Sequence, residues 1–173
     1  MAQPFLDALQ ATGAHPALAG HAETYAWMIG SWTGEVTDFP DEINVLRGPV
    51  EMHASWVLQG RAIQDVWIAP AGSAPGQIQA ERYGTTLRIF DTAHAQWDVR
   101  WFNPVSGAQV SLSGQRVGDQ LVQLGMINGR LVRWVFSEIT SRQFLWQGFV
   151  LGEDGQTWRL QTQFRFERSS SQD

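Results

Sequence analysis

Hydrophobic and polar residues alternate along most of this chain beyond residue 30, with the period of two that a β-strand gives. The clearest run is 50–58, where Val, Met, Ala, Trp and Leu alternate with Glu, His and Ser. Residues 158–166 repeat the pattern, with Trp, Leu, Thr and two Phe sharing one side. Both runs predict half-buried strands that pack one face and expose the other to water.

Turn signals separate these runs. Asn128-Gly129 is the strongest hairpin signal, because both positions tolerate positive φ. Gln59-Gly60 indicates a two-residue turn that would place Leu58 opposite Arg61. Further strands are expected at 81–90, 95–103, 108–116, 119–127, 130–138, 142–151 and 156–167.

About ten strands in nearly continuous up-and-down order favour a closed barrel, because closure removes the exposed edges of the sheet. Helical spacing of apolar residues predicts one or two short helices within residues 1–28. We therefore expect a mainly β protein: one domain over 1–173, with a helical segment 1–28 and a closed antiparallel barrel over 29–168. A flat β-sandwich is the alternative, and a helix-grip fold is disfavoured because no long C-terminal helix is visible.

The stretch that joins the helical segment to the strands is Gly30-Ser31-Trp32. It resembles the glycine-any-tryptophan signature of the calycin superfamily, which includes lipocalins, fatty-acid-binding proteins and related bacterial barrels. The resemblance implies a closed barrel with a plugging tryptophan, and an arginine near the chain end that pairs with it. Arg165 and Arg168 are the two arginines available for that role.

Composition excludes several kinds of chemistry. The net charge of −5 disfavours a general nucleic-acid surface. The chain has no cysteine and no lysine, which excludes disulfides, thiol catalysis and Schiff-base chemistry. It shows neither a signal-peptide pattern nor an apolar run of membrane-spanning length, so we expect a cytoplasmic protein without membrane partners.

The expected hairpin at Gln59-Gly60 turns Arg61, Asp65 and Trp67 toward the barrel interior. Arg61 and Asp65 are about 13 Å apart along one strand, so each needs another partner or a ligand. A hairpin at Asn128-Gly129 sets Leu124 opposite Arg133 and turns Arg133 inward as well. The predicted ligand-binding residues are Trp56, Arg61, Asp65, Trp67, Trp101 and Arg133.

This register leaves four aromatic residues outside the barrel: Trp134, Phe136, Phe144 and Trp146. A contiguous aromatic surface predicts either a homodimer interface or cover by the N-terminal helices. In the opposite case a bulge shifts the register, the four rings line the cavity, and Arg133 lies outside. The apolar partner strand, with Val122, Leu124 and Met126, favours the first arrangement.

The four histidines show no metal-binding spacing, so no metal is expected. Haem barrels of similar shape use a histidine near the chain end. No histidine follows His94 here, so no cofactor is expected either. The favoured function is binding of a small apolar or acidic amphipathic molecule, held by arginine and aromatic residues.

Two alternatives to binding remain open. One is a barrel enzyme of isomerase, cyclase or dehydratase type, with Asp65 as the general acid or base and an arginine as anchor. The other is a structural dimer with a filled core, in which the interior charges only satisfy one another. The sequence does not decide whether the protein catalyses a reaction.

Overall fold

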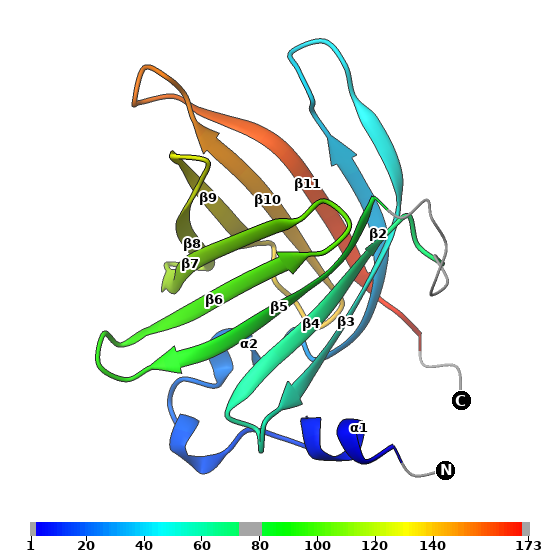
Figure 1. Ribbon diagram of the computed structural model, residues 1–173, viewed down its shortest axis with the longest axis vertical. Coiled ribbons are helices and arrows are strands. Elements are labelled where there is room, and N and C mark those ends of the chain that lie inside the picture. Colours follow the sequence, from blue (N-terminus) through cyan, green and yellow to red (C-terminus); the bar gives the residue numbers. More distant parts are fainter. Residues whose placement is uncertain (1–2, 73–80, 171–173) are drawn as a thin grey trace.

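A computed structural model describes residues 3–72 and 81–170, and within these ranges ten antiparallel strands form a closed up-and-down barrel (Figure 1). Each strand pairs with its sequence neighbour, and pairing of the last strand with the first closes the cylinder. This confirms the predicted fold class. The strands are β2 (Gly30–Asp38), β3 (Leu46–Val57), β4 (Ala62–Ala69), β5 (Arg82–Asp91), β6 (Gln96–Asn103), β7 (Ala108–Val117), β8 (Gln120–Ile127), β9 (Arg130–Ser137), β10 (Gln143–Leu151) and β11 (Trp158–Arg168).

The N-terminal segment lies at one end of this barrel (Figure 1). It comprises α1 (Pro4–Leu9), the two-residue strand β1 (Gln10–Ala11) beside β3, the 3-10 turn η1 (Pro16–Leu18), and α2 (Glu23–Ala26). The second helix is shorter than its apolar spacing predicts, and Gly20 interrupts it with a φ of +82°. Tyr25 and Met28 are fully buried, so this segment closes the end of the barrel. No helix in the described ranges is long and apolar enough to cross a bilayer.

Trp32 packs on the inside of this closed end and is completely buried. Its indole Nε1 donates to the carbonyl of Met28 at 2.8 Å, and its ring meets Phe144 edge-on at 4.9 Å. Trp32, the single bulky side chain between Gly30 and Gly34, therefore plugs the floor, as the resemblance implies.

Arg168, the last residue of β11, clamps the same end from outside. Its guanidinium lies 4.1 Å from the centre of the Trp32 ring and donates to the carbonyls of Trp27, Ile29 and Ser141 at 2.7–2.9 Å. Gly30 is required beside it, because the Gly30 φ is +122° and a Cβ there would lie 2.6 Å from Arg168 Nη1. Arg168 is thus the arginine that the resemblance implies, and Arg165 instead pairs with Glu138 at the surface.

The predicted pairing of β8 with β9 is correct, but the predicted face is wrong. Leu124 lies opposite Arg133 as expected, yet both point away from the barrel interior. The Arg133 guanidinium packs outside over the rings of Phe149 and Trp158. The residues that face inward instead are Trp134, Phe136, Phe144 and Trp146.

Ring size explains why the aromatic face of β9 and β10, and not the opposite face, points inward. Each large aromatic side chain buries about 150–250 Å², more than the Val, Leu and Met side chains of β8 that compete for the interior. Leu124 and Met126 consequently remain 40% and 58% exposed. The aromatic surface on which the homodimer prediction depended therefore does not exist, and the homodimer itself stays a prediction.

The inward placement of Arg61 is also wrong. The β3–β4 connection has four residues rather than two, because Val57 pairs with Ala62 and both Leu58 and Gln59 adopt positive φ. Arg61 therefore lies in the turn, exposed, with its Nη2 atom 3.0 Å from His15 Nε2. The longer turn leaves Asp65 and Trp67 facing inward, as predicted.

We predict that Arg168→Ala lowers the free energy of unfolding by at least about 2 kcal/mol, because it removes charge-assisted hydrogen bonds and a cation–π contact together. Arg165→Ala on the same strand is the matched control, since Arg165 is half exposed in its ion pair, and it should have a much smaller effect. Urea denaturation followed by tryptophan fluorescence measures both. If both variants lose the same free energy of unfolding, the contacts of Arg168 contribute no more stability than the surface ion pair of Arg165.

Candidate functional site

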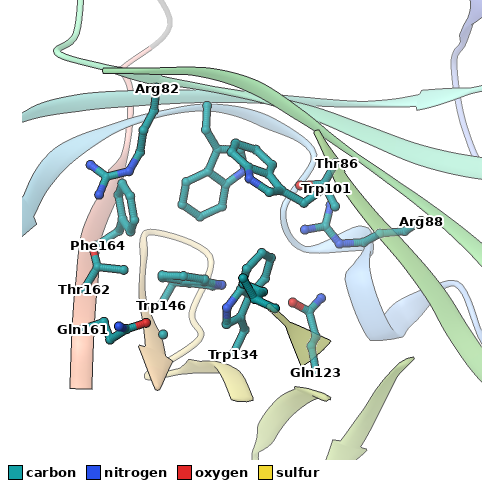
Figure 2. Close-up of a pocket in the computed structure, with 13 residues that line it drawn as sticks. Arg82, Thr86, Arg88, Trp101, Gln123, Trp134, Trp146, Gln161, Thr162 and Phe164 are labelled. Atoms are coloured by element: carbon teal, nitrogen blue, oxygen red, sulfur yellow. The ribbon is translucent and has the colours of Figure 1, made fainter. Parts of the chain in front are cut away.

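The barrel encloses a cavity of about 200 Å³ toward the end opposite the helices (Figure 2). Residues near that end of several strands line it, among them Arg82 at the start of β5, Ile127 at the end of β8 and Gln161 early in β11. The cavity is partly open to solvent, so a small molecule can enter from this side without displacing the plugged floor.

Five aromatic rings form the walls: Trp67, Trp101, Trp134, Trp146 and Phe164. All but Trp101 pack edge to face, with ring centres 5.8 Å apart for Trp67 and Trp146, 5.3 Å for Trp134 and Trp146, and 5.0 Å for Trp67 and Phe164. Rings held against one another in this way make a preformed apolar wall.

Glycines on the inner face make room for two of these rings. The Trp101 indole lies directly over Gly84, where a Cβ would collide with its outer carbons. A Cβ at Gly148 would lie 2.8 Å from the Trp146 ring. Larger residues at 84 or 148 would therefore push an indole into the cavity.

A β-bulge shapes the rim. Gly148 pairs with Thr162 and Phe149 pairs with Leu160, which leaves Gln161 as an extra residue in β11. Gln161 and Thr162 both line the cavity as a result. The bulge places two polar side chains at an otherwise aromatic opening.

Deeper in the barrel, Arg88 of β5 and Asp65 of β4 form a buried ion pair. Arg88 Nη1 donates to Asp65 Oδ2, and the backbone N–H of Thr86 donates to Oδ1 at 3.0 Å. The two side chains are only 2% and 0% exposed. Asp65 is enclosed behind Arg88 and does not line the cavity, whereas Arg88 does.

Tyr25 supports Arg88 from the floor. The Arg88 guanidinium lies 5.1 Å from the centre of the Tyr25 ring, and the Tyr25 hydroxyl accepts a hydrogen bond from Gln123 Nε2 at 2.9 Å. Burial raises the pKa of the Tyr25 phenol, and the positive charge of Arg88 opposes part of that rise. Tyr25 is therefore a neutral phenol that completes the polar floor.

A second ion pair lies near the rim. Arg82 Nη2 donates to Asp38 Oδ1 at 2.6 Å, and the Arg82 guanidinium lies 5.4 Å from the centre of the Phe164 ring. Both members are about one-fifth to one-quarter exposed. Each arginine that lines the cavity thus has its own carboxylate.

Four polar atoms of the cavity lining have no hydrogen-bond partner among the described residues. They are Trp67 Nε1, Arg82 Nη1, Arg88 Nε and Thr162 Oγ1. Three are N–H donors that cannot accept, and buried donors normally find an acceptor. All four atoms are enclosed by neighbouring protein atoms, so they are unsatisfied groups within the wall and do not reach into the cavity.

The structure brings together only part of the predicted site. Trp67 and Trp101 line the cavity, and Asp65 lies behind it. Trp56 is buried in the core without reaching the cavity, while Arg61 and Arg133 lie outside the barrel.

Sequence reasoning missed Arg82, Arg88 and Gln123. Arg88 shares the inward phase of β5 with Gly84 and Thr86, and Thr86 pairs directly with Asp65. That register could not be predicted from the sequence, because a long connection and not a short turn joins β4 to β5. Gln123 could have been found from its pairing with Trp134, once the inward face of β9 was known.

In the described part of the chain, no three His, Cys, Asp or Glu side chains cluster in a way that would hold a metal ion. The titratable groups of the cavity are arginines paired with aspartates. This arrangement can hold and orient a molecule, and it presents no free carboxylate to a ligand.

Comparisons with known proteins confirm the fold. The S-type phycobiliprotein lyase CPES from Guillardia theta matches with a TM-score of 0.56 and 13% identity, over 87% of this chain and 93% of its own. Rv2717c from M. tuberculosis matches with a TM-score of 0.60 and 13% identity, over 91% and 99%. Both likenesses show a shared fold. No protein-family model and no curated protein matches the sequence.

We predict that Asp65→Asn destabilises the fold by about 3–5 kcal/mol, because it leaves the buried Arg88 charge without its carboxylate. Glu138→Gln, which breaks the half-exposed pair with Arg165, is the matched control and should have a far smaller effect. Chemical denaturation of both variants gives the comparison. An unchanged midpoint for Asp65→Asn would mean that Arg88 does not depend on Asp65.

Tyr25 predicts a specific loss of stability at alkaline pH. Its folded-state pKa is raised above the ordinary 10.0, so its contribution is fully present below pH 10. Above pH 10 the unfolded chain loses the phenolic proton first, and stability falls by up to about 1.4 kcal/mol per pH unit until the folded pKa is reached.

The chain has no lysine or cysteine, which would also titrate at alkaline pH, and it has only two tyrosines. The effect of the Tyr25 phenol on the unfolding free energy can therefore be measured without interference from those groups. Tyr25→Phe should abolish the alkaline slope of the unfolding free energy, whereas Tyr83→Phe, at a partly exposed position, should retain it. A slope that survives in Tyr25→Phe would contradict the assignment.

Proposed function

We propose that this protein binds a small apolar or amphipathic molecule inside its barrel. The observation that supports the proposal most strongly is a partly open cavity inside the barrel that five aromatic rings line together with a few polar side chains. A filled structural core would not leave this space, and a few polar side chains among apolar and aromatic ones are typical of small-molecule sites.

The volume limits the size of the ligand. An apolar cavity of about 150 Å³ is enough to admit benzene, and the cavity here measures about 200 Å³. The proposed ligand is therefore a single substituted ring or a short branched chain. The cavity is smaller than the pockets that hold drug-sized ligands, which measure about 300–1,000 Å³.

The proposal does not include catalysis by Asp65. A general acid or base must come within hydrogen-bond reach of its substrate. The Asp65 carboxylate is fully buried, bonded to Arg88 and Thr86, and separated from the cavity by Arg88. Its role here is to hold Arg88 in place.

We predict that wild-type protein binds at least one single-ring compound from a panel of toluene, phenol, acetophenone and benzoate, as measured by saturation-transfer NMR. Thr162→Phe should abolish this binding, because the new ring fills the cavity near the rim. Thr33→Phe makes the same replacement at an exposed position of β2 and should leave binding unchanged.

Native mass spectrometry of the purified protein provides the second readout, because a co-purified molecule of fitting size identifies the natural ligand directly. The absence of both a co-purified molecule and panel binding would refute the proposed function. Binding that persists in Thr162→Phe would place the ligand elsewhere on the protein.

A further inference from the structure

We infer that two copies of this chain associate through the outside of the barrel. The loop between β2 and β3 of each copy docks in a groove on the outer face of β7–β11 of the other copy. This interface differs from the predicted aromatic one, and it does not depend on a ligand in the cavity.

The outer groove crosses five neighbouring strands, from β7 to β11, and measures about 520 Å³. Its walls are mainly apolar and include Val122, Leu124, Leu131, Phe149 and Trp158. Leu124 and Leu131 are 40% and 37% exposed although they belong to the middle of a sheet. A continuous apolar surface of this kind on the outside of a protein typically marks an interaction site.

Arg133 is the one charged side chain among the described residues that line the outer groove. The arginines that are buried or half-buried in the described ranges are Arg82, Arg88, Arg133 and Arg168. The first two have carboxylates, and Arg168 has three backbone carbonyls. Within the part of the chain that the structure describes, Arg133 has neither an ion pair nor a hydrogen bond. A half-buried charge is unfavourable without a counter-charge, so this groove favours an occupant with a carboxylate.

The atoms of Arg133 that such a carboxylate would meet are accessible. Nε is enclosed by neighbouring atoms, whereas Nη1 and Nη2 retain contact with solvent. The rings of Phe149 and Trp158 lie 5.1 Å and 4.5 Å from the guanidinium carbon and hold the group in place. The guanidinium is therefore positioned in advance for a charged partner.

The β2–β3 loop, residues 39–45, has the complementary chemistry and projects from the end of the barrel opposite the helices (Figure 1). Ile43 and Val45 in the loop and Leu46 at the start of β3 are 89%, 49% and 60% exposed. Single exposed aliphatic side chains are ordinary, but three within four positions form a patch. Glu42 beside them is exposed and has no ion pair among the described residues.

The loop is also held in a defined conformation. Asp41 Oδ1 accepts hydrogen bonds from the backbone N–H groups of Ile43 and Asn44 at 2.8 Å and 2.7 Å, and Oδ2 accepts one from Asn44 Nδ2 at 2.6 Å. These bonds occupy the Asp41 carboxylate and leave that of Glu42 for a partner. A preformed loop also loses less conformational entropy when it docks.

The positions of loop and groove favour a second copy as the occupant. β11 contributes Trp158 to one edge of the outer groove, and β11 pairs directly with β2, which leads into the loop. The loop and the groove therefore lie on the same side of the barrel. Two copies related by a two-fold axis can each insert a loop in the other, which gives a closed dimer in place of an open chain.

Sedimentation velocity over a concentration series tests the inference, and the wild-type chain should form dimers. Glu42→Arg places like charges together and should raise the dimer Kd at least about tenfold. Ile43→Ser should also weaken the dimer, because it removes an aliphatic side chain from the interface. Glu23→Arg makes the same charge reversal at an exposed position of the helical end and should leave the Kd unchanged.

Exchange of the two charges tests the contact itself. Arg133→Glu should weaken the dimer as Glu42→Arg does, and the double variant should recover most of the wild-type affinity, because the ion pair forms again with its signs exchanged. Circular dichroism verifies that each variant is folded. If Arg133→Glu does not fold, Glu42→Arg and Ile43→Ser decide the question, since both positions are exposed on the loop.

A wild-type chain that stays monomeric at every concentration would overturn the inference. A dimer that neither loop variant weakens would overturn it as well, because its interface would lie elsewhere. A folded double variant that associates no better than the single variants would show that Glu42 and Arg133 do not meet, and would also count against it. Ligand binding in the cavity is measured separately, so none of these results decides the proposed function.

Discussion

The clamp between Arg168 and Trp32 is the constraint from which the rest of the architecture follows. Through a stacked guanidinium and three backbone carbonyls, it joins the last strand of the barrel to the first strand, to the turn before that first strand and to the β9–β10 connection. Closure at this end leaves the opposite end as the route by which solvent or a ligand reaches the cavity. Gly30 is needed for the same contact. Its positive φ favours glycine, and a side chain at this position would collide with Arg168.

Above the plug, the buried Arg88–Asp65 pair divides the barrel into a packed floor and a usable cavity. Removing a charge pair from water is unfavourable unless its hydrogen bonds are satisfied, and here Thr86, the Tyr25 ring and the facing Gln123–Tyr25 bond supply a polar setting. Such a pair contributes little net stability compared with a hydrophobic replacement. Its place at the base of the aromatic cavity gives the interior a fixed polar floor.

Alternation and turn signals in the sequence predicted the ten strands within a few residues and the closed barrel, and the resemblance of Gly30-Ser31-Trp32 implied the plugging tryptophan. They also predicted the pairing of Leu124 with Arg133, because a short Asn-Gly turn determines a register locally. They did not predict which face of these paired strands points inward, because side chains far apart in the sequence compete for the interior. They also failed on Arg61, where a four-residue turn replaced the expected two, and on Arg88, whose register with Asp65 is set across a long connection.

The two matched barrels share only 13% of their residues with this chain, yet they align over most of its length. Strand closure therefore tolerates nearly complete sequence change, because backbone hydrogen bonds and a period-two pattern satisfy it. The positions of Trp67, Arg82 and Arg88, the glycines beneath the indoles and the bulge at Gln161 are properties of this sequence. The fold thus accounts for the existence of an enclosed space, and the side chains that line it determine which molecules that space can accept.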